Sequence, residues 1–246
     1  MSGASFGEEG RRLSYGGYLK LPELLALQQG LSDAHDELLF ITVHQAYELW
    51  FKAVLFELES ARDLVLGDDL PAALHLLRRV HVIERLLVQQ IEVLETMAPR
   101  DFLDFRQQLA PASGFQSVQF REIEFLSGLP DRRYLDLLET SSDERARLER
   151  RLSEPTLRSA FEAARRAHGE PPLADLVRSG GQLFDLAEAL LDHDEAFAHW
   201  RSRHVLMVER QIGSKPGTGG SSGAAYLRGT LSKRFFPELW EIRTAL

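Results

Sequence analysis

The sequence predicts an all-α fold built on long core helices. Between residues 71 and 99, apolar side chains recur at steps of three and four, which places them in one stripe along a helix. The stripe consists of Leu77, Val80, Ile83, Leu87, Ile91 and Leu94. No stretch alternates between apolar and polar residues as a strand does between turn signals. The chain of 246 residues can bury a sizeable core, and we expect one helical domain over residues 1–246.

Three long helices are expected in chain order. The first covers about residues 33–66 and ends before a glycine. The second has Pro71 in its first turn and ends at Pro99, because proline is tolerated at the start of a helix and cannot continue one. The third covers about residues 181–212. The short helices between residues 128 and 170 are charged, and we expect them to be peripheral.

Composition narrows the classes of function. A net charge of -8 disfavours a nucleic-acid-binding protein, which usually shows a basic face. The absence of cysteine excludes disulfides, thiolate catalysis, iron–sulfur clusters and cysteine-ligated metal. No secretory signal opens the chain, and the apolar run "LLFITV" is far too short to cross a bilayer. We expect a soluble, cytoplasmic protein that binds neither nucleic acid nor membrane.

Most of the eight histidines have a structural interpretation. His75 and His81 lie on a charged helix and are expected in solvent, and His168 lies in a surface loop. His193, in "LDHDEAF", is expected on the solvent side of its helix. His35 lies beside a helix start, where a local structural role is favoured. No histidine has a glutamate three residues before it, so the Glu-x-x-His pattern of carboxylate-bridged metal sites is missing.

His204 is different because its neighbours on the expected third helix are apolar. His199 lies five residues earlier and therefore points to another side of the helix, which disfavours a site with several histidines. A single histidine in such surroundings can be an axial haem ligand. A lone histidine in a helix is more often structural, and the spacing alone favours that interpretation.

The segment "GTGGSSG" at residues 217–223 is the most glycine-rich part of the chain. It lacks the Gly-Lys-Ser/Thr ending of a phosphate loop and the preceding strand of a dinucleotide site. It could be a linker, but the residues that follow are apolar enough to pack. A loop that closes over a ligand is then plausible, with Thr218 as a hydroxyl carried on a movable backbone.

Two pairs of side chains share helix faces. Phe40 and His44 are four residues apart, and so are Phe102 and Arg106. Aromatic rings favour a flat apolar ligand, and arginine binds carboxylates through two parallel hydrogen bonds. Together the pairs suggest a pocket for an aromatic amino acid, although core packing and a surface arginine would give the same pattern.

Six segments of the chain, taken together, resemble the tryptophan 2,3-dioxygenase family. They are "LSYGGYLKL", "HDELLFITVHQAYELWFK", "FELES", "FRQQLAPASGFQSVQFREIEFLSG", "WRSRHVLMVERQIGSKPGTGGSSG" and "FFPELWEIR". They follow the order of the family and span nearly the whole chain. The region between residues 128 and 200 is shorter than is usual in the family, which puts peripheral helices and subunit contacts in doubt more than the pocket.

The resemblance implies a mostly helical haem b protein that assembles as a homotetramer. His204 corresponds to the axial ligand of the haem iron, and the expected haem-binding residues also include Trp200 and Ser113. Tyr15 and Tyr18, in an N-terminal segment of residues 1–30, would reach the pocket of a neighbouring subunit.

The resemblance also implies a substrate site for L-tryptophan and O2. His44 would bond to the indole N–H, Arg106 to the carboxylate and Thr218 to the ammonium group, while Phe40 and Phe102 pack against the indole ring. The implied reaction inserts O2 across the indole C2–C3 bond and gives N-formylkynurenine. Two alternatives remain open. One is a paralogue in secondary metabolism that acts on a modified tryptophan, for example by mono-oxygenation to an oxindole, and the other is a non-catalytic sensor of haem or tryptophan.

Overall fold

The computed structural model describes residues 14–138 and 140–246, and within these ranges the chain is helical and contains no strand. The prediction of an all-α fold is confirmed. The elements, in order, are α1 (Tyr15–Leu19), α2 (Leu21–Leu24), α3 (Glu37–Leu66), α4 (Leu70–Glu95), α5 (Pro99–Arg106), η1 (Gln107–Leu109), η2 (Gly114–Gln116), α6 (Val118–Ser127), α7 (Tyr134–Leu137), α8 (Ser142–Ser153), α9 (Leu157–Ala167), α10 (Leu173–Ser179), α11 (Gln182–Ile212), α12 (Ala224–Arg228), α13 (Pro237–Glu241) and η3 (Ile242–Ala245).

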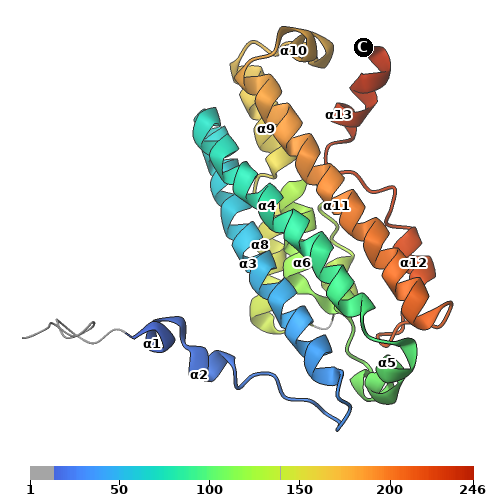
Figure 1. Cartoon of the computed structure of the whole chain (residues 1–246). Helices are drawn as coiled ribbons and strands as arrows, with labels where there is room; N and C mark the ends of the chain where they lie inside the picture. Colours follow the sequence, from blue (N-terminus) through green and yellow to red (C-terminus); the bar gives the residue numbers. More distant parts are fainter. Residues whose placement is uncertain (1–13, 139) are drawn as a thin grey trace, which may run out of the picture.

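The long helices α3, α4 and α11 lie side by side and form the body of the molecule (Figure 1). Helix α3 begins at Glu37, four residues later than predicted, because the Glu37 carboxylate accepts hydrogen bonds from the backbone N–H groups of Leu31 and Ser32 and holds these residues in a loop. Helix α4 has Pro71 in its first turn, as predicted. It ends at Glu95, so Pro99 starts α5 and does not stop α4.

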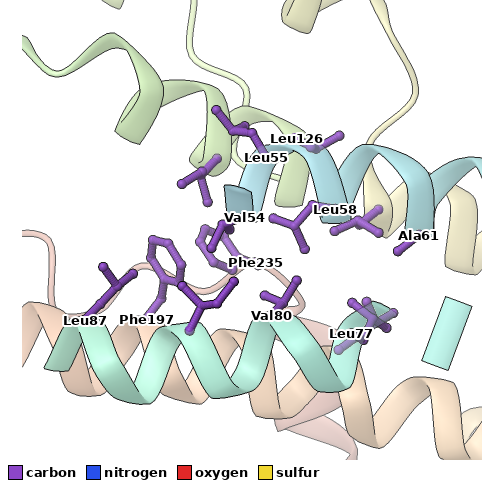
Figure 2. Close-up of a cluster of buried hydrophobic side chains, with 14 of the residues drawn as sticks. Val54, Leu55, Leu58, Ala61, Leu77, Val80, Leu87, Leu126, Phe197 and Phe235 are labelled. Carbon is purple, nitrogen blue, oxygen red and sulfur yellow. The ribbon is translucent and has the colours of Figure 1, made fainter. Parts of the chain in front are cut away.

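The main core lies between α3 and α4 and continues to α11 (Figure 2). Val54, Leu58 and Ala61 of α3 are fully buried opposite Leu77 and Val80 of α4. The predicted apolar stripe of α4 is therefore the face that fills this space. Each fully buried valine or leucine of this set contributes about 1.5–3 kcal/mol relative to exposure, so this packing fixes the positions of the helices that carry the site.

The middle region is less peripheral than predicted. Helix α9 buries Leu157, Ala160, Phe161 and Ala164, which follow a helical spacing and join the main core beside α3. Helix α8 is charged, but its Arg151 is buried and pairs with buried Glu122 and with Glu59. Ion pairs with residues far away in the sequence therefore allow this charged helix to bury an arginine.

The prediction that His193 faces solvent is wrong. Its ring is fully buried, with Nδ1 2.5 Å from Glu84 Oε1 and Nε2 2.8 Å from Ser127 Oγ. The reason is that α11 packs against α4 and bonds to Ser127 of α6, so one side of this polar turn faces the interior. His81 is half-buried, with Nε2 2.9 Å from the Ala189 carbonyl oxygen, and is also less solvated than predicted.

His75 on α4 and His168 at the end of α9 are exposed, as predicted. His35, for which a local structural role was predicted, is exposed before α3, with Nδ1 2.8 Å from Asp36 Oδ1. No helix within the described ranges is long and apolar enough to cross a membrane.

The short helices α1 and α2 stand apart from the body of the molecule (Figure 1). Tyr15 and Tyr18 on α1 are 77% and 69% exposed. Of the predicted N-terminal segment 1–30, residues 1–13 lie outside the described residues. The division of the chain into one domain stays a prediction.

Candidate functional site

A cavity of about 650 Å³ lies at one end of the bundle, lined by α3, α11, the residues from α5 to α6, and the loop after α11. Eight of the ten predicted site residues line it, and they come from four separate parts of the sequence. These eight are Phe40, His44, Phe102, Arg106, Ser113, Trp200, His204 and Thr218. Tyr15 and Tyr18 do not line it, and their contact with a neighbouring subunit stays a prediction.

His204 lines the cavity from α11. Its ring stacks on Trp200, one turn earlier, with centroids 4.9 Å apart and planes at 18°. Burial, with a smaller effect from His44, lowers the pKa of His204 to about 4. The imidazole is therefore neutral at physiological pH and has a lone pair available to a metal. Burial and the charge of His44 are the causes of this pKa shift, and no hydrogen bond to the ring contributes to it among the described residues.

His44 lines the cavity from α3. Its Nδ1 lies 2.7 Å from the Phe40 carbonyl oxygen, which can only accept a hydrogen bond. Nδ1 therefore carries the proton, and Nε2 is a hydrogen-bond acceptor in the neutral ring. Burial lowers the pKa of His44, although the Phe40 carbonyl and the charge of Glu48 oppose this shift. A neutral His44 can accept a hydrogen bond from a ligand N–H.

Aromatic rings surround His44. The ring centroids of Phe40 and His44 are 4.0 Å apart, and those of Phe40 and Phe102 are 5.7 Å apart with planes at 27°. Phe105 packs edge-on against both phenylalanines and is fully buried. This wall suits a flat apolar ring that carries one N–H group.

The glycine-rich segment, defined here as residues 213–223, lines the cavity and is joined to the opposite wall by polar contacts. Arg106 donates from Nη2 to the Pro216 carbonyl oxygen at 2.5 Å, and the Thr218 hydroxyl donates to the Ala112 carbonyl oxygen at 2.5 Å. Gly219 lies so close to Ser113 that an added Cβ would be 2.6 Å from the Ser113 Cβ. The two side chains expected to bind a ligand thus hold backbone carbonyls in this structure.

Gly223 closes the glycine-rich segment. Its φ of +62° is in the left-handed region, and an added Cβ would be 2.4 Å from the Lys215 carbonyl oxygen. Only glycine meets both conditions without strain. Glycine at position 223 therefore allows the end of the segment to lie against the backbone of Lys215 near its start.

A buried carboxylate at the cavity wall is surrounded by positive charge. Glu124 lies 2.6 Å from Arg121 Nη1, 3.0 Å from Arg201 Nη2 and 3.5 Å from Lys233 Nζ. Burial raises the pKa of Glu124, but the three cations together hold it below its usual value. The three cations outnumber the two carboxylates that act on them, Glu124 and Asp194, and Arg121 Nε has no partner in the described part of the chain.

Sequence reasoning missed Arg121, Glu124 and Arg201, all of which line the cavity. The signal available was their place inside the segments "QFREIEF" and "WRSRH", which belong to the longer segments that carry the family resemblance. Their net positive charge suits a ligand that carries carboxylates.

Comparison with known proteins agrees with this arrangement. A family model described as tryptophan 2,3-dioxygenase matches residues 2–175 and 175–246. A tryptophan 2,3-dioxygenase of Nocardioides sp. is 55% identical, with 98% of each chain covered. Proteins of the same name are 42% identical in Caulobacter vibrioides, over 95% of this chain and 98% of the relative, and 43% identical in Anaeromyxobacter sp., over 95% and 96%. The chain belongs to the tryptophan 2,3-dioxygenase family.

Proposed function

We propose that this protein is a haem-dependent dioxygenase that inserts O2 across the indole C2–C3 bond of L-tryptophan and gives N-formylkynurenine. One observation carries the proposal: neutral His204 and neutral His44 line the same cavity from α11 and α3, beside Arg106 and Thr218. The names of the relatives support tryptophan as substrate and oxygenation as reaction. They favour this function over action on a modified tryptophan or a non-catalytic sensor.

The residues present fit haem b. His204 is a neutral nitrogen donor, and the sequence has no cysteine to compete for iron. Trp200 stacks on His204 and fixes its ring plane. The excess positive charge at Arg121 and Arg201 suits the carboxylates of a porphyrin. His204 would hold the iron, and Ser113 and Trp200 would contact the group. Bound haem supplies the binding and activation of O2.

Residues of the chain would bind tryptophan through hydrogen bonds, one of which replaces a bond within the chain. The substrate carboxylate would replace the Pro216 carbonyl at Arg106, because a charged acceptor bonds more strongly to guanidinium than a neutral one. The substrate ammonium would donate to the Thr218 hydroxyl oxygen, which can accept this bond while its O–H still donates to the Ala112 carbonyl. The glycine-rich segment thereby orders around the substrate.

His44 orients the reacting bond. Its Nε2 accepts a hydrogen bond from the indole N–H, while Phe40 and Phe102 hold the ring plane. The indole N–H is a very weak acid, so His44 holds this proton and does not need to remove it. The closed glycine-rich segment excludes water from the cavity during oxygen insertion.

We further propose that the protein acts in the cytoplasm as a homotetramer. The exposed rings of Tyr15 and Tyr18, on a helix that stands apart from the bundle, support a contact with the cavity of a neighbouring subunit. The proposed single domain then has an N-terminal segment, residues 1–30, that serves its neighbour.

The mass of the product tests the proposal. Purified haem-loaded protein is incubated with L-tryptophan and 18O2, and the product is analysed by mass spectrometry. Gain of two labelled oxygen atoms with an opened indole ring is expected. Gain of one atom would identify a mono-oxygenase, and binding of tryptophan without any product would identify a sensor.

A further inference from the structure

Glu48 has no role in the function described so far, although it lies in the segment "HQAYELWFK" beside His44. It is one helical turn after His44 on α3, so the two side chains share a face. Both line the cavity. Glu48 belongs to the same wall of the site as His44.

The Glu48 carboxylate is bonded at both oxygens to another part of the chain. Oε1 accepts a hydrogen bond from Ser117 Oγ at 2.6 Å, and Oε2 accepts one from Gln119 Nε2 at 2.7 Å. Gln119 Nε2 also donates to the Glu48 backbone carbonyl oxygen at 2.9 Å. Three hydrogen bonds thus join one turn of α3 to residues 117–119.

Residues 117–119 connect directly to the surface that receives the glycine-rich segment. The Ser117 hydroxyl accepts from the backbone N–H of Phe120 and caps α6, and Ser117 follows η2. Ser113 caps the other end of η2 and lies against Gly219. A short and fully bonded path therefore runs from the turn that carries His44 to the contact that closes the cavity.

The negative charge of Glu48 also affects how well His44 accepts a hydrogen bond. Two neutral donors satisfy the carboxylate, and within the described residues no cation within 4.0 Å neutralises it. Its charge opposes the effect of burial on the pKa of His44. A negative charge one turn away also makes Nε2 of His44 a better hydrogen-bond acceptor.

We propose that Glu48 is a positioning residue. Its carboxylate holds the turn of α3 that carries His44 in register with residues 113–119, so that Nε2 of His44 and the closed glycine-rich segment meet the substrate together. The inference rests on the proposed function, because the ligand group that His44 receives is the indole N–H.

A double-mutant cycle on the haem-loaded protein tests the inference. Glu48→Gln removes the negative charge: the new amide can accept from Gln119 and donate to the Ser117 hydroxyl, but both bonds are then between neutral groups and are weaker. Loss of the charge from these bonds should lower kcat/KM for L-tryptophan about tenfold. The same substitution made in a His44→Ala background should change kcat/KM less than about twofold, because the residue through which Glu48 acts is gone.

Glu57→Gln is the matched control. Glu57 lies on the same helix and pairs with Arg79 at 2.6 Å, but does not line the cavity. It should leave kcat/KM within about twofold of the parent in both backgrounds. Gln119→Ala removes two of the three bonds without changing Glu48 and is measured in the same cycle, so the inference is also tested if Glu48→Gln loses haem.

Two results would overturn the inference. Kinetics for both Glu48→Gln and Gln119→Ala equal to those of the control would show that neither the charge nor the bonds have a role. An equal loss with and without His44 would show that Glu48 only stabilises packing. Failure of the proposed function is recognised separately, because the unsubstituted protein would then form no oxygenated product from tryptophan.

Discussion

Substitution of Gly219 by alanine should weaken closure of the glycine-rich segment. The added Cβ would lie 2.6 Å from Ser113 Cβ and 3.3 Å from the Pro111 carbonyl oxygen. Carbon atoms in contact are about 3.5–4.0 Å apart, so residue 219 must move away from Ser113 by about 1 Å. The φ of Gly219 is not in the left-handed region, so contact alone causes the strain.

These contacts allow an estimate of how much Gly219→Ala raises the free energy of the closed glycine-rich segment. Overpacking costs about 1–3 kcal/mol, and displacement of the Thr218 hydroxyl from the Ala112 carbonyl removes a hydrogen bond that contributes about 0.5–1.5 kcal/mol. KM for L-tryptophan should therefore rise by about tenfold or more, with haem content unchanged. Steady-state kinetics of the haem-loaded variant measure this rise.

A compensating substitution isolates the cause. Ser113→Gly removes the Cβ that the methyl group introduced by Gly219→Ala would meet. The double variant should therefore recover most of the affinity for tryptophan that Gly219→Ala loses. An unchanged KM in Gly219→Ala, or a double variant no better than the single one, would refute the steric reasoning.

Three further predictions concern the side chains that line the cavity. His204→Ala should abolish stable haem uptake. Because burial lowers the pKa of His204 to about 4, the unsubstituted apoprotein should take up haem from pH 7 down to about pH 5 and fail near pH 4, where a proton occupies the donor nitrogen. Soret absorbance measures the uptake, and circular dichroism shows whether the protein stays folded. Arg106→Leu should cost about 2–5 kcal/mol in kcat/KM for tryptophan with normal haem content, and equal turnover of indole substrates without a carboxylate by the unsubstituted enzyme would contradict this role. His44→Ala should lower turnover about tenfold to a thousandfold, yet leave it measurable and admit 1-methyl-tryptophan; complete inactivity on both substrates with haem and fold intact would indicate an obligatory base.

The helical fold could be predicted because its main signals are local. The stripe of α4 and the extents of α3 and α11 follow from spacings of three and four residues. Local signals fail where a side chain bonds to distant residues. His193 lies in a polar stretch, but its partner Glu84 is 109 residues away and makes the turn an interior one.

The residues of the site could likewise be predicted where the signal is local or belongs to the family resemblance, and not where it depends on distant contacts. Within-helix spacing paired Phe40 with His44 and Phe102 with Arg106, and the family resemblance assigned the remaining residues. The bond from Arg106 to Pro216 spans 110 residues, and the charge cluster around Glu124 joins α6 to α11 and to Lys233. Neither follows from a pattern within one segment, because both depend on how the bundle brings its ends together.

The cavity of about 650 Å³ also makes the free energy of unfolding depend on the supply of the ligand that binds in it. It is interior space that the chain's own side chains leave unfilled, so the molecule that fills it binds the folded chain and has no comparable site on the unfolded one. Such a ligand at a hundred times its Kd adds about 2.7 kcal/mol to the free energy of unfolding. Cellular proteases remove chains in proportion to the time these spend unfolded. With haem as the proposed ligand, the quantity of this protein in a cell should therefore follow the supply of haem.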